Sequence, residues 1–249
     1  MIKHNLQQSL REIFAYFHIG HTPDQYLDEL EADTDFLSAI EARVANVPEF
    51  RTKRFESIYQ LGKAFKIVQY ALVRALRPQC CVETGVLHGL STSFILNALS
   101  KNGGGQLISI DRPAHETWTD RAVSESGMVD TDNLPRHSNL PGWVIPDPLR
   151  PYWTLELGLS SELLPLVLDR HTCDYFVHDS EHTYANMTFE LELAWEKFHG
   201  PGAIVCDNID WSAAFQDFAD KHHLRPLFIT EEGEISVKNQ RFGLVRHPG

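Results

Sequence analysis

From residue 78 onward, short apolar runs alternate with segments of helical periodicity, and this alternation constrains the fold more than any other feature of the sequence. The runs QCCVETG, GQLISID, YWTLELG, CDYFVHD and GAIVCDN predict strands. Most of them precede a helical pattern, such as STSFILNALSKNGGG with its terminating glycines. RPLFIT and RFGLVRH, joined by a short polar linker, predict a final antiparallel pair. We therefore expect an α/β fold with a seven-stranded, mostly parallel sheet, helices on both faces and an antiparallel C-terminal strand.

Residues 1–77 differ, because apolar residues recur there at three- and four-residue spacing over long stretches. LREIFAYF, DQYLDELEADTDFLSAIEARV and FESIYQLGKAFKIVQYALVRAL predict helices. We divide the chain into a helical N-terminal extension at 1–77 and an α/β domain at 78–249. Within this domain, residues 112–151 are rich in proline and polar residues, and we expect an insertion that forms a lid or lines the substrate side.

Composition and charge exclude several classes of function. The chain of 249 residues has 22 Lys+Arg against 34 Asp+Glu, and its net charge of −12 repels nucleic-acid phosphates and anionic membrane surfaces. No window approaches the roughly 18 apolar residues that a membrane span requires. The four cysteines lie in or beside apolar runs without CxxC spacing, so we expect reduced, buried thiols. We expect a soluble cytoplasmic protein that binds neither nucleic acid nor membranes, and the apolar helical extension leaves a homo-oligomer open.

The first predicted strand runs into a glycine turn, ETGVLHGLS at residues 83–91. Glycines at a strand-to-helix turn let a ligand approach the backbone, and the N–H groups of the helix start favour a negatively charged group. The GxxxG spacing differs from the GxGxxG of dinucleotide sites, and Glu83 would suit a cationic group. Asp111 ends the second strand, where a carboxylate can accept hydrogen bonds from both ribose hydroxyls. The residues predicted to contact a nucleotide-like cofactor are Glu83, Gly85, Val86, Gly89, Ser91 and Asp111.

Two further predicted strands end in hard oxygen donors. Asp179 follows one of them, and Asp207 and Asn208 follow the other. If these strands are neighbours in the sheet, the three side chains should emerge on one rim, where ligands of doubly wound folds bind. Two carboxylates and an amide oxygen form a suitable partial shell for Mg²⁺, which keeps several waters and leaves room for substrate oxygens. Such a site is suited to holding a hydroxyl.

A helical pattern follows the strand CDYFVHD. We expect a helix from about Glu181 to His199, with Ser180 as its N-cap and Glu181 interacting with its N-terminus. His182 on the first turn is the candidate base that accepts the proton of a hydroxyl, and the alternative is that it only caps or orients the helix. We expect His178 to pack or hydrogen-bond under the sheet.

Two stretches of the sequence resemble one known family. ETGVLHGLS, followed by a strand that ends in Asp, fits the pattern (E/D)xGxxxGxS and is similar to the cofactor site of class I S-adenosylmethionine-dependent methyltransferases. DYFVHDSEHTYANMTFELELAWEKFHGPGAIVCDN is similar to the second half of a bacterial small-molecule branch of this superfamily, and the arrangement resembles the metal-dependent O-methyltransferases of the catechol and macrocin types. The resemblance covers about residues 78–246 and leaves out the helical N-terminal third.

The resemblance implies a Rossmann-like fold, S-adenosylmethionine as cofactor, and Mg²⁺-assisted transfer of a methyl group to a hydroxyl of a small molecule. Asp179, Asp207 and Asn208 would map onto the metal ligands, and His182 with Asp179 onto the catalytic residues. This chain departs from the family after the third strand, where Leu159 and Ser160 replace the usual acidic residue near the adenine. Ser160 is the candidate contact there. The branch often ends the fifth strand with two acids, whereas this chain has an acid and an amide.

The residues leave other functions open. A nicotinamide oxidoreductase would share the sheet and Asp111, although the glycine spacing differs. The adjacent pair His178-Asp179 suggests a metal phosphohydrolase, but such sites need further histidines on helices. An accessory protein that binds the cofactor without catalysis would keep the same fold. The methyl acceptor is also open between a sugar, another natural product and a phenol. Trp118 and Trp143 of the insertion suggest a flat or sugar-like surface, and the alternative is that they anchor a lid.

Overall fold

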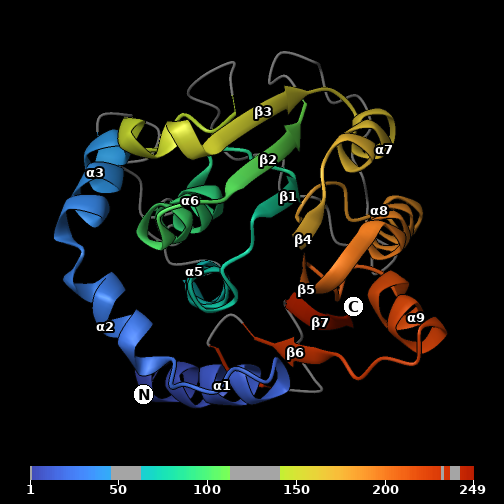
Figure 1. Ribbon diagram of the computed structural model, residues 1–249, viewed down its shortest axis with the longest axis horizontal. Coiled ribbons are helices and arrows are strands. Elements are labelled where there is room, and N and C mark those ends of the chain that lie inside the picture. Colours follow the sequence, from blue (N-terminus) through green and yellow to red (C-terminus); the bar gives the residue numbers. More distant parts are fainter. Residues whose placement is uncertain (1, 46–62, 113–140, 231–232, 236–241) are drawn as a thin grey trace.

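The computed structural model describes residues 2–45, 63–112, 141–230, 233–235 and 242–249 (Figure 1). Trp118 and most of the predicted insertion lie outside the described residues, as does the first part of the helix predicted from residue 55. None of the helices in the described part is long and apolar enough to cross a membrane.

A seven-stranded sheet forms the centre of the molecule, with the order β3-β2-β1-β4-β5-β7-β6. The first five strands pair in parallel, and β7 is antiparallel to both of its neighbours, as predicted. The strands are β1 (Cys80–Thr84), β2 (Gln106–Asp111), β3 (Trp153–Leu157), β4 (Cys173–His178), β5 (Phe198–Asp207), β6 (Leu227–Ile229) and β7 (Phe242–Pro248).

Helices cover both faces of the sheet (Figure 1). On one face lie α5 (Lys63–Leu76) and α6 (Leu90–Asn102), and on the other lie α7 (Ser160–Arg170), α8 (Tyr184–Lys197) and α9 (Ala214–Lys221). Glycine ends α6 as the sequence predicts, because Gly103 adopts a left-handed conformation with φ of 75° that glycine tolerates best. A short 3₁₀ helix, η2 (Asp147–Tyr152), occupies the end of the segment predicted as an insertion.

Successive residues of a strand point to opposite faces, so each strand contributes to two apolar cores. In β1, Cys81 packs in the core shared with α5 and α6, whereas Val82 packs in the core shared with α7, α8 and α9. The same alternation recurs in β4 and β5. All four cysteines are buried and free, as predicted. The predicted Rossmann-like fold is therefore confirmed.

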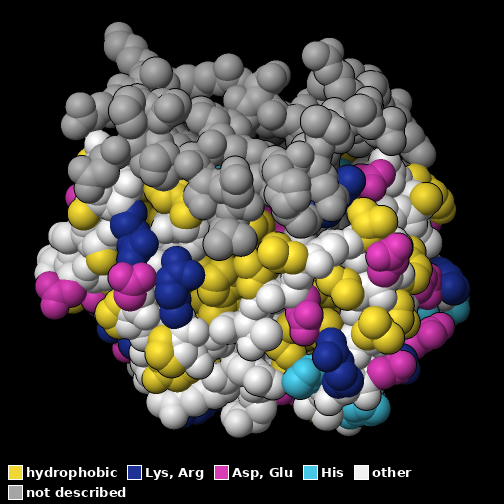
Figure 2. All heavy atoms as spheres, turned by 90° about the horizontal axis from the view of Figure 1, so that it is seen from above, with side chains coloured by type: hydrophobic (Ala, Val, Ile, Leu, Met, Phe, Trp, Pro, Cys, Tyr) yellow, Lys and Arg dark blue, Asp and Glu magenta, His cyan; other side chains and the backbone are white. Residues whose placement is uncertain are grey.

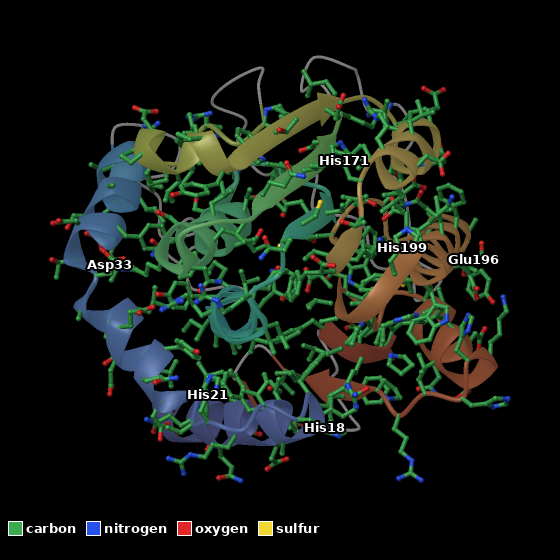
Figure 3. All side chains as sticks on the ribbon, in the orientation of Figure 1. His18, His21, Asp33, His171, Glu196 and His199 are labelled. Atoms are coloured by element: carbon green, nitrogen blue, oxygen red, sulfur yellow. The ribbon has the colours of Figure 1, made fainter. Side chains whose placement is uncertain are left out.

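The N-terminal helices curve around α5 and α6, and the first of them runs alongside the edge of the sheet at β6 (Figure 1). They are α1 (Ile2–Tyr16), α2 (Asp24–Ala32) and α3 (Thr34–Ala45). Phe14 and Ile40 are buried in the same apolar core as the sheet residues facing α5. Asp33 lies at the junction of α2 and α3 (Figure 3), and its carboxylate accepts a 3.0 Å hydrogen bond from Asn97 of α6. The extension is therefore part of the folded body rather than an appended tail.

Hydrophobic side chains gather on the side of the molecule that carries β3 and α7 (Figure 2). The large hydrophobic residues of the described part with the most exposed side chains include Leu157, Leu159 and Leu166, from the end of β3 and from α7. Leu157 is the last residue of β3, which is an edge strand of the sheet, and Leu159 follows it two residues later. Apolar surface is therefore available next to the edge of the sheet where ligands of doubly wound folds bind.

Candidate active site

The strand register brings the predicted site residues to one edge of the sheet. Thr84 of β1 pairs with His178 of β4, which pairs with Cys206 of β5, so these three strands end side by side. The next residues along β4 and β5 are Asp179 and Asp207. The strand order reverses between β1 and β4, because β1 leads to β2 on one side and β4 to β5 on the other. Such a switch point at the carboxyl ends of the strands is where doubly wound folds bind ligands.

Three side chains converge at this point. One potential ligand atom from each of Asp179, His182 and Asp207 lies within 4.8 Å of the others. His182 and Asp207 are buried, and the Asp179 side chain is 28% exposed, so the cluster opens at Asp179. His182 Nε2 lies 3.7 Å from Asp179 Oδ1, and the ring packs against Trp211 with 5.3 Å between centroids. The sequence predicted both acids and His182 for one site, and the structure brings the three side chains together.

Asn208 borders the cluster in an unusual conformation. Its φ of 50° is left-handed, which asparagine adopts more readily than most residues. The side-chain Nδ2 lies 3.2 Å from His182 Nε2, while Oδ1 is buried without a hydrogen-bond partner among the described residues. A buried carbonyl oxygen without a partner is costly, because it has given up its hydrogen bonds to water. A cation beside Asp207 would satisfy this oxygen, so these donors fit the predicted Mg²⁺.

The segment after β4 differs from the prediction. The helix α8 begins at Tyr184 and its N-cap is Thr183, whose side chain accepts a hydrogen bond from Asn186 N, so neither Ser180 nor Glu181 starts it. His182 accordingly precedes the helix instead of standing on its first turn. The predicted C-terminal end at His199 was also too late, because β5 begins at Phe198. As a result, Asp179 and His182 are carried by a non-helical link.

The glycine turn lies directly against this link. Gly85 has a φ of 86°, and a Cβ at that position would lie 2.0 Å from the carbonyl oxygen of Asp179. Only glycine allows this approach. The turn predicted to hold the cofactor and the acid predicted to hold a metal are therefore in backbone contact.

Asp111 is bound by the glycine turn itself. Its Oδ2 accepts hydrogen bonds from the backbone N–H groups of Val86 and Leu87, at 3.1 and 2.8 Å. Leu87 has a left-handed φ of 50°, which turns successive N–H groups toward one acceptor. These two N–H groups, expected to favour a negatively charged ligand group, instead bind the protein's own carboxylate. Asp111 keeps the predicted position at the end of β2, next to the turn.

Glu83 is buried near the carboxyl end of β1. It is 1% exposed, and its Oε1 accepts a 2.5 Å hydrogen bond from Ser109, whose oxygen in turn accepts one from Trp153 Nε1. Burial raises the pKa of Glu83 to about 8, because the surroundings disfavour a charged carboxylate. Its hydrogen-bond partners among the described residues include the hydroxyl group of Ser109, and its contact with a cationic group of the cofactor stays a prediction.

The remaining predicted cofactor residues are spread along the same edge. Ser91 lies on the first turn of α6, half-buried. Gly89 is the N-cap of that helix with φ of 82°, and a Cβ there would lie 2.7 Å from Gly142 Cα, so Gly89 packs against the end of the insertion. Ser160 starts α7, and its Oγ lies 3.4 Å from Asn186 Oδ1 of α8.

Sequence reasoning missed two features of the site. Glu190 of α8 is fully buried and bonded to His178, although it stands on the apolar stripe of the helix between Met187 and Ala194. An acid on the buried face of a helix indicates a buried polar partner, so the sequence contained a signal for Glu190. The second feature is the end of the insertion, where Trp143 Nε1 donates to His88 Nδ1 in the glycine turn at 3.0 Å. That contact joins distant segments, and no local pattern indicates it.

Comparisons with known proteins identify the family. A model of a family described as "Methyltransferase domain" matches residues 82–209, a little over half of the chain. Among curated proteins no match was found.

Solved structures share the fold at low sequence identity. The O-methyltransferase TomG from Streptomyces achromogenes, crystallised in complex with SAM, is 16% identical, with a TM-score of 0.52 over 87% of this chain and 91% of its own. A putative O-methyltransferase from Klebsiella pneumoniae is 16% identical, with a TM-score of 0.52 over 91% and 96%. The O-methyltransferase from Bacillus cereus in complex with SAH is 14% identical, with a TM-score of 0.52 over 91% and 96%. The family match and the common fold confirm the resemblance to class I methyltransferases, and the chain belongs to the methyltransferase domain family.

Proposed function

We propose that this protein transfers a methyl group from S-adenosylmethionine to a hydroxyl of a small molecule, with the assistance of Mg²⁺. The observation that carries the proposal is the convergence of Asp179, His182 and Asp207 beside the glycine turn. Structures of similar fold were crystallised with SAM or SAH and are described as O-methyltransferases, which supports the same cofactor and reaction here.

The cofactor would lie along the carboxyl ends of β1, β2 and β3. Asp111 would accept the ribose hydroxyls at its lone pairs not used by the backbone N–H groups of Val86, Leu87 and Arg112. The exposed side chains that follow β3 offer an apolar surface for the adenine, with Ser160 beside them. When bound, S-adenosylmethionine supplies an electrophilic methyl group.

The acceptor hydroxyl would be held by the acids and the amide of the site. We propose Asp179, Asp207 and the Oδ1 of Asn208 as ligands of the metal, and this Oδ1 has no hydrogen-bond partner in the described part of the chain. Bound Mg²⁺ would lower the pKa of the hydroxyl and fix its direction. The position of Asp179 at the exposed side of the cluster leaves the acceptor a way in.

His182 is the residue we propose as base. Its Nε2 faces the Asn208 amide at 3.2 Å, so the acceptor hydroxyl must displace that contact to reach the lone pair. Trp211 and His178 pack against the ring at 5.3 and 5.5 Å between centroids and hold its plane. A base that is buried and sterically confined in this way loses little freedom when the acceptor binds.

Calorimetric titration with S-adenosylhomocysteine, with and without Mg²⁺, tests the proposal together with methyl transfer from labelled S-adenosylmethionine to catechol and to a methyl glycoside. We expect cofactor binding and Mg²⁺-dependent labelling of one acceptor class. Tight binding of NAD without any S-adenosylhomocysteine heat would favour an oxidoreductase and contradict the family's chemistry. If the His182→Ala variant binds the cofactor and turns over as fast as the parent protein, His182 is not the base.

A further inference from the structure

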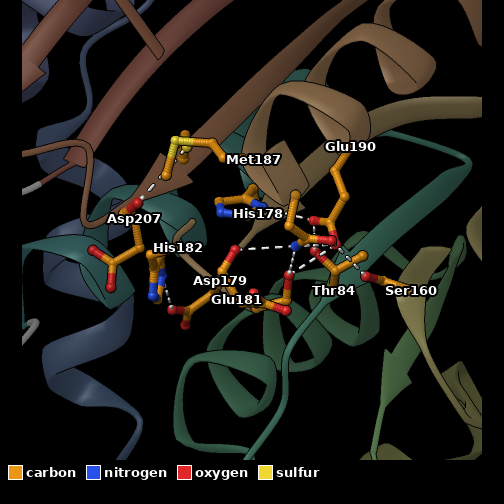
Figure 4. A network of polar contacts seen from close by, with 12 residues as sticks. Thr84, Ser160, His178, Asp179, Glu181, His182, Met187, Glu190 and Asp207 are labelled. Atoms are coloured by element: carbon orange, nitrogen blue, oxygen red, sulfur yellow. Dashed lines mark hydrogen bonds and ion pairs between the residues drawn. The ribbon is translucent and has the colours of Figure 1, made fainter. Parts of the chain in front are cut away.

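Glu190 collects hydrogen bonds from four different parts of the fold (Figure 4). Its Oε2 bonds to His178 Nδ1 of β4 at 2.6 Å and to the hydroxyl of Thr84, the last residue of β1. Its Oε1 accepts from Ser180 Oγ of the link after β4 at 2.8 Å and from Asn186 Nδ2 of α8 at 3.0 Å. One carboxylate thus ties together two strand ends, the link and the helix.

A charged carboxylate in this position is expensive. Glu190 and His178 are both fully buried, and burial raises the pKa of Glu190, but the interaction with His178 and the other hydrogen bonds outweigh burial and leave the pKa below its ordinary value. Replacing a buried ion pair with apolar residues of similar volume is often neutral or stabilising. General stability therefore gives little reason for an acid here, and the position of its partners suggests another.

The partners surround the link that carries the candidate site. Asp179 is held at its backbone by a 2.9 Å hydrogen bond to Thr84 O, and Ser180 follows it immediately. Asn186 Nδ2 also lies 3.0 Å from Glu181 O, next to His182. The link is not helical, so its conformation depends on these contacts.

His178 connects the network to His182 as well. Because the ionised Glu190 can only accept, His178 must carry its proton on Nδ1. The ring of His178 stands at 88° to that of His182, with 5.5 Å between centroids. Its Nε2 is buried without a hydrogen-bond partner among the described residues. Glu190 therefore fixes the orientation of a ring that packs directly on the candidate base.

We propose that Glu190 is a positioning residue that holds Asp179 and His182 in the geometry needed for metal binding and proton transfer. This inference rests on the proposed function, because it concerns the same site. Glu190 reaches neither the metal ligands nor the base directly and acts through Ser180, His178 and Asn186. Residues one step behind metal ligands orient those ligands and tune their affinity.

The test compares Glu190→Gln with the parent protein, using Mn²⁺ binding by electron paramagnetic resonance and S-adenosylhomocysteine binding by calorimetry. The glutamine keeps the shape but removes the charge and two acceptor positions. We expect Mn²⁺ affinity to fall about 10-fold or more, with S-adenosylhomocysteine affinity within about two-fold of the parent. Neither measurement requires knowledge of the methyl acceptor.

Two control variants separate positioning from stability. Glu192→Gln makes the same change on the same helix, at a partly exposed residue paired with Lys221 instead of the site. Leu164→Ala removes buried apolar volume from the same core without touching the polar network. Both should bind Mn²⁺ like the parent, although Leu164→Ala melts at a lower temperature. If Leu164→Ala weakens Mn²⁺ binding as much as Glu190→Gln does, Glu190 has only a structural role and the inference is overturned.

The outcomes also separate this inference from the proposed function. A parent protein that binds S-adenosylhomocysteine and Mn²⁺, with unchanged Mn²⁺ affinity in Glu190→Gln, would overturn the positioning role alone. A parent that binds no S-adenosylhomocysteine would overturn the proposed function, and one that binds it but no Mn²⁺ would overturn the metal site and the positioning role together. If Glu190→Gln does not fold, Ser180→Ala removes a single hydrogen bond to Glu190 and should weaken Mn²⁺ binding about 3-fold or more. Parent-like Mn²⁺ affinity in Ser180→Ala would then decide against the inference.

Discussion

Glu83 should make the stability of this protein fall as pH rises. The pKa of its buried carboxyl is raised to about 8 from an ordinary value of 4.5. Between these two values the folded chain keeps the proton while the unfolded chain releases it, so rising pH favours unfolding across that window. Glu83→Gln cannot ionise and should lack this term. Urea unfolding from about pH 5 to about pH 8 should show the parent losing on the order of a few kcal/mol relative to the variant. Parallel pH profiles for the two proteins would mean that Glu83 ionises freely.

Asp207 should be essential for metal binding. It is 8% exposed and contributes one of the three converging groups of the site. Asp207→Asn should weaken Mn²⁺ binding by at least the ~10- to 100-fold that loss of an outer-shell partner costs. The same substitution at the exposed Asp210 is the matched control, and electron paramagnetic resonance measures both. Similar affinities in the two variants would place the metal elsewhere.

At the scale of single elements, the start of α8 depends on Thr183. Its side chain caps the helix by accepting a hydrogen bond from Asn186 N. Thr183→Ala should lower the free energy of unfolding by about 1 kcal/mol, whereas Thr183→Ser, which keeps the hydroxyl, should cost much less. Chemical denaturation monitored by circular dichroism measures both. If Ser180 were the effective cap, the alanine variant would match the parent.

The strand elements were readable from the sequence, and the link between β4 and α8 was not. Short apolar runs locate the strands. The sequence alone therefore shows that Asp111, Asp179 and Asp207 lie at strand ends, whichever strands are neighbours in the sheet. Ser180 has the chemistry of an N-cap, but its hydroxyl is taken by Glu190, ten residues further along the chain. The bond between Asp111 and the glycine turn depends on the left-handed backbone of Leu87, which a hydrophobic pattern does not indicate. In both cases, contacts in the folded protein determine the role of the residue, and the local sequence does not reveal them.

At the scale of the whole molecule, we expect the N-terminal helices and the sheet to unfold together. Phe14 of α1 is 2% exposed and belongs to the same core as Val177 of β4. Phe14→Ala should therefore cost about 3–5 kcal/mol and lower the melting temperature of the entire chain in a single transition. Differential scanning calorimetry distinguishes this from independent melting of the extension, which would appear as a separate transition with the main one unmoved.

Hydrogen bonds anchor both ends of the insertion at the glycine turn. Gly142 N and Val144 N donate to the carbonyl oxygens of Leu87 and His88, at 3.0 Å each, and Asp111 before the insertion is bound by the same turn. The anchors before and after the insertion are therefore bonded to the same turn. The entropic cost of joining two fixed anchors grows only slowly with the number of residues between them. Evolution or design could therefore exchange the insertion for shorter or longer sequences, and so diversify what the protein recognises, while the strand ends beneath stay in register.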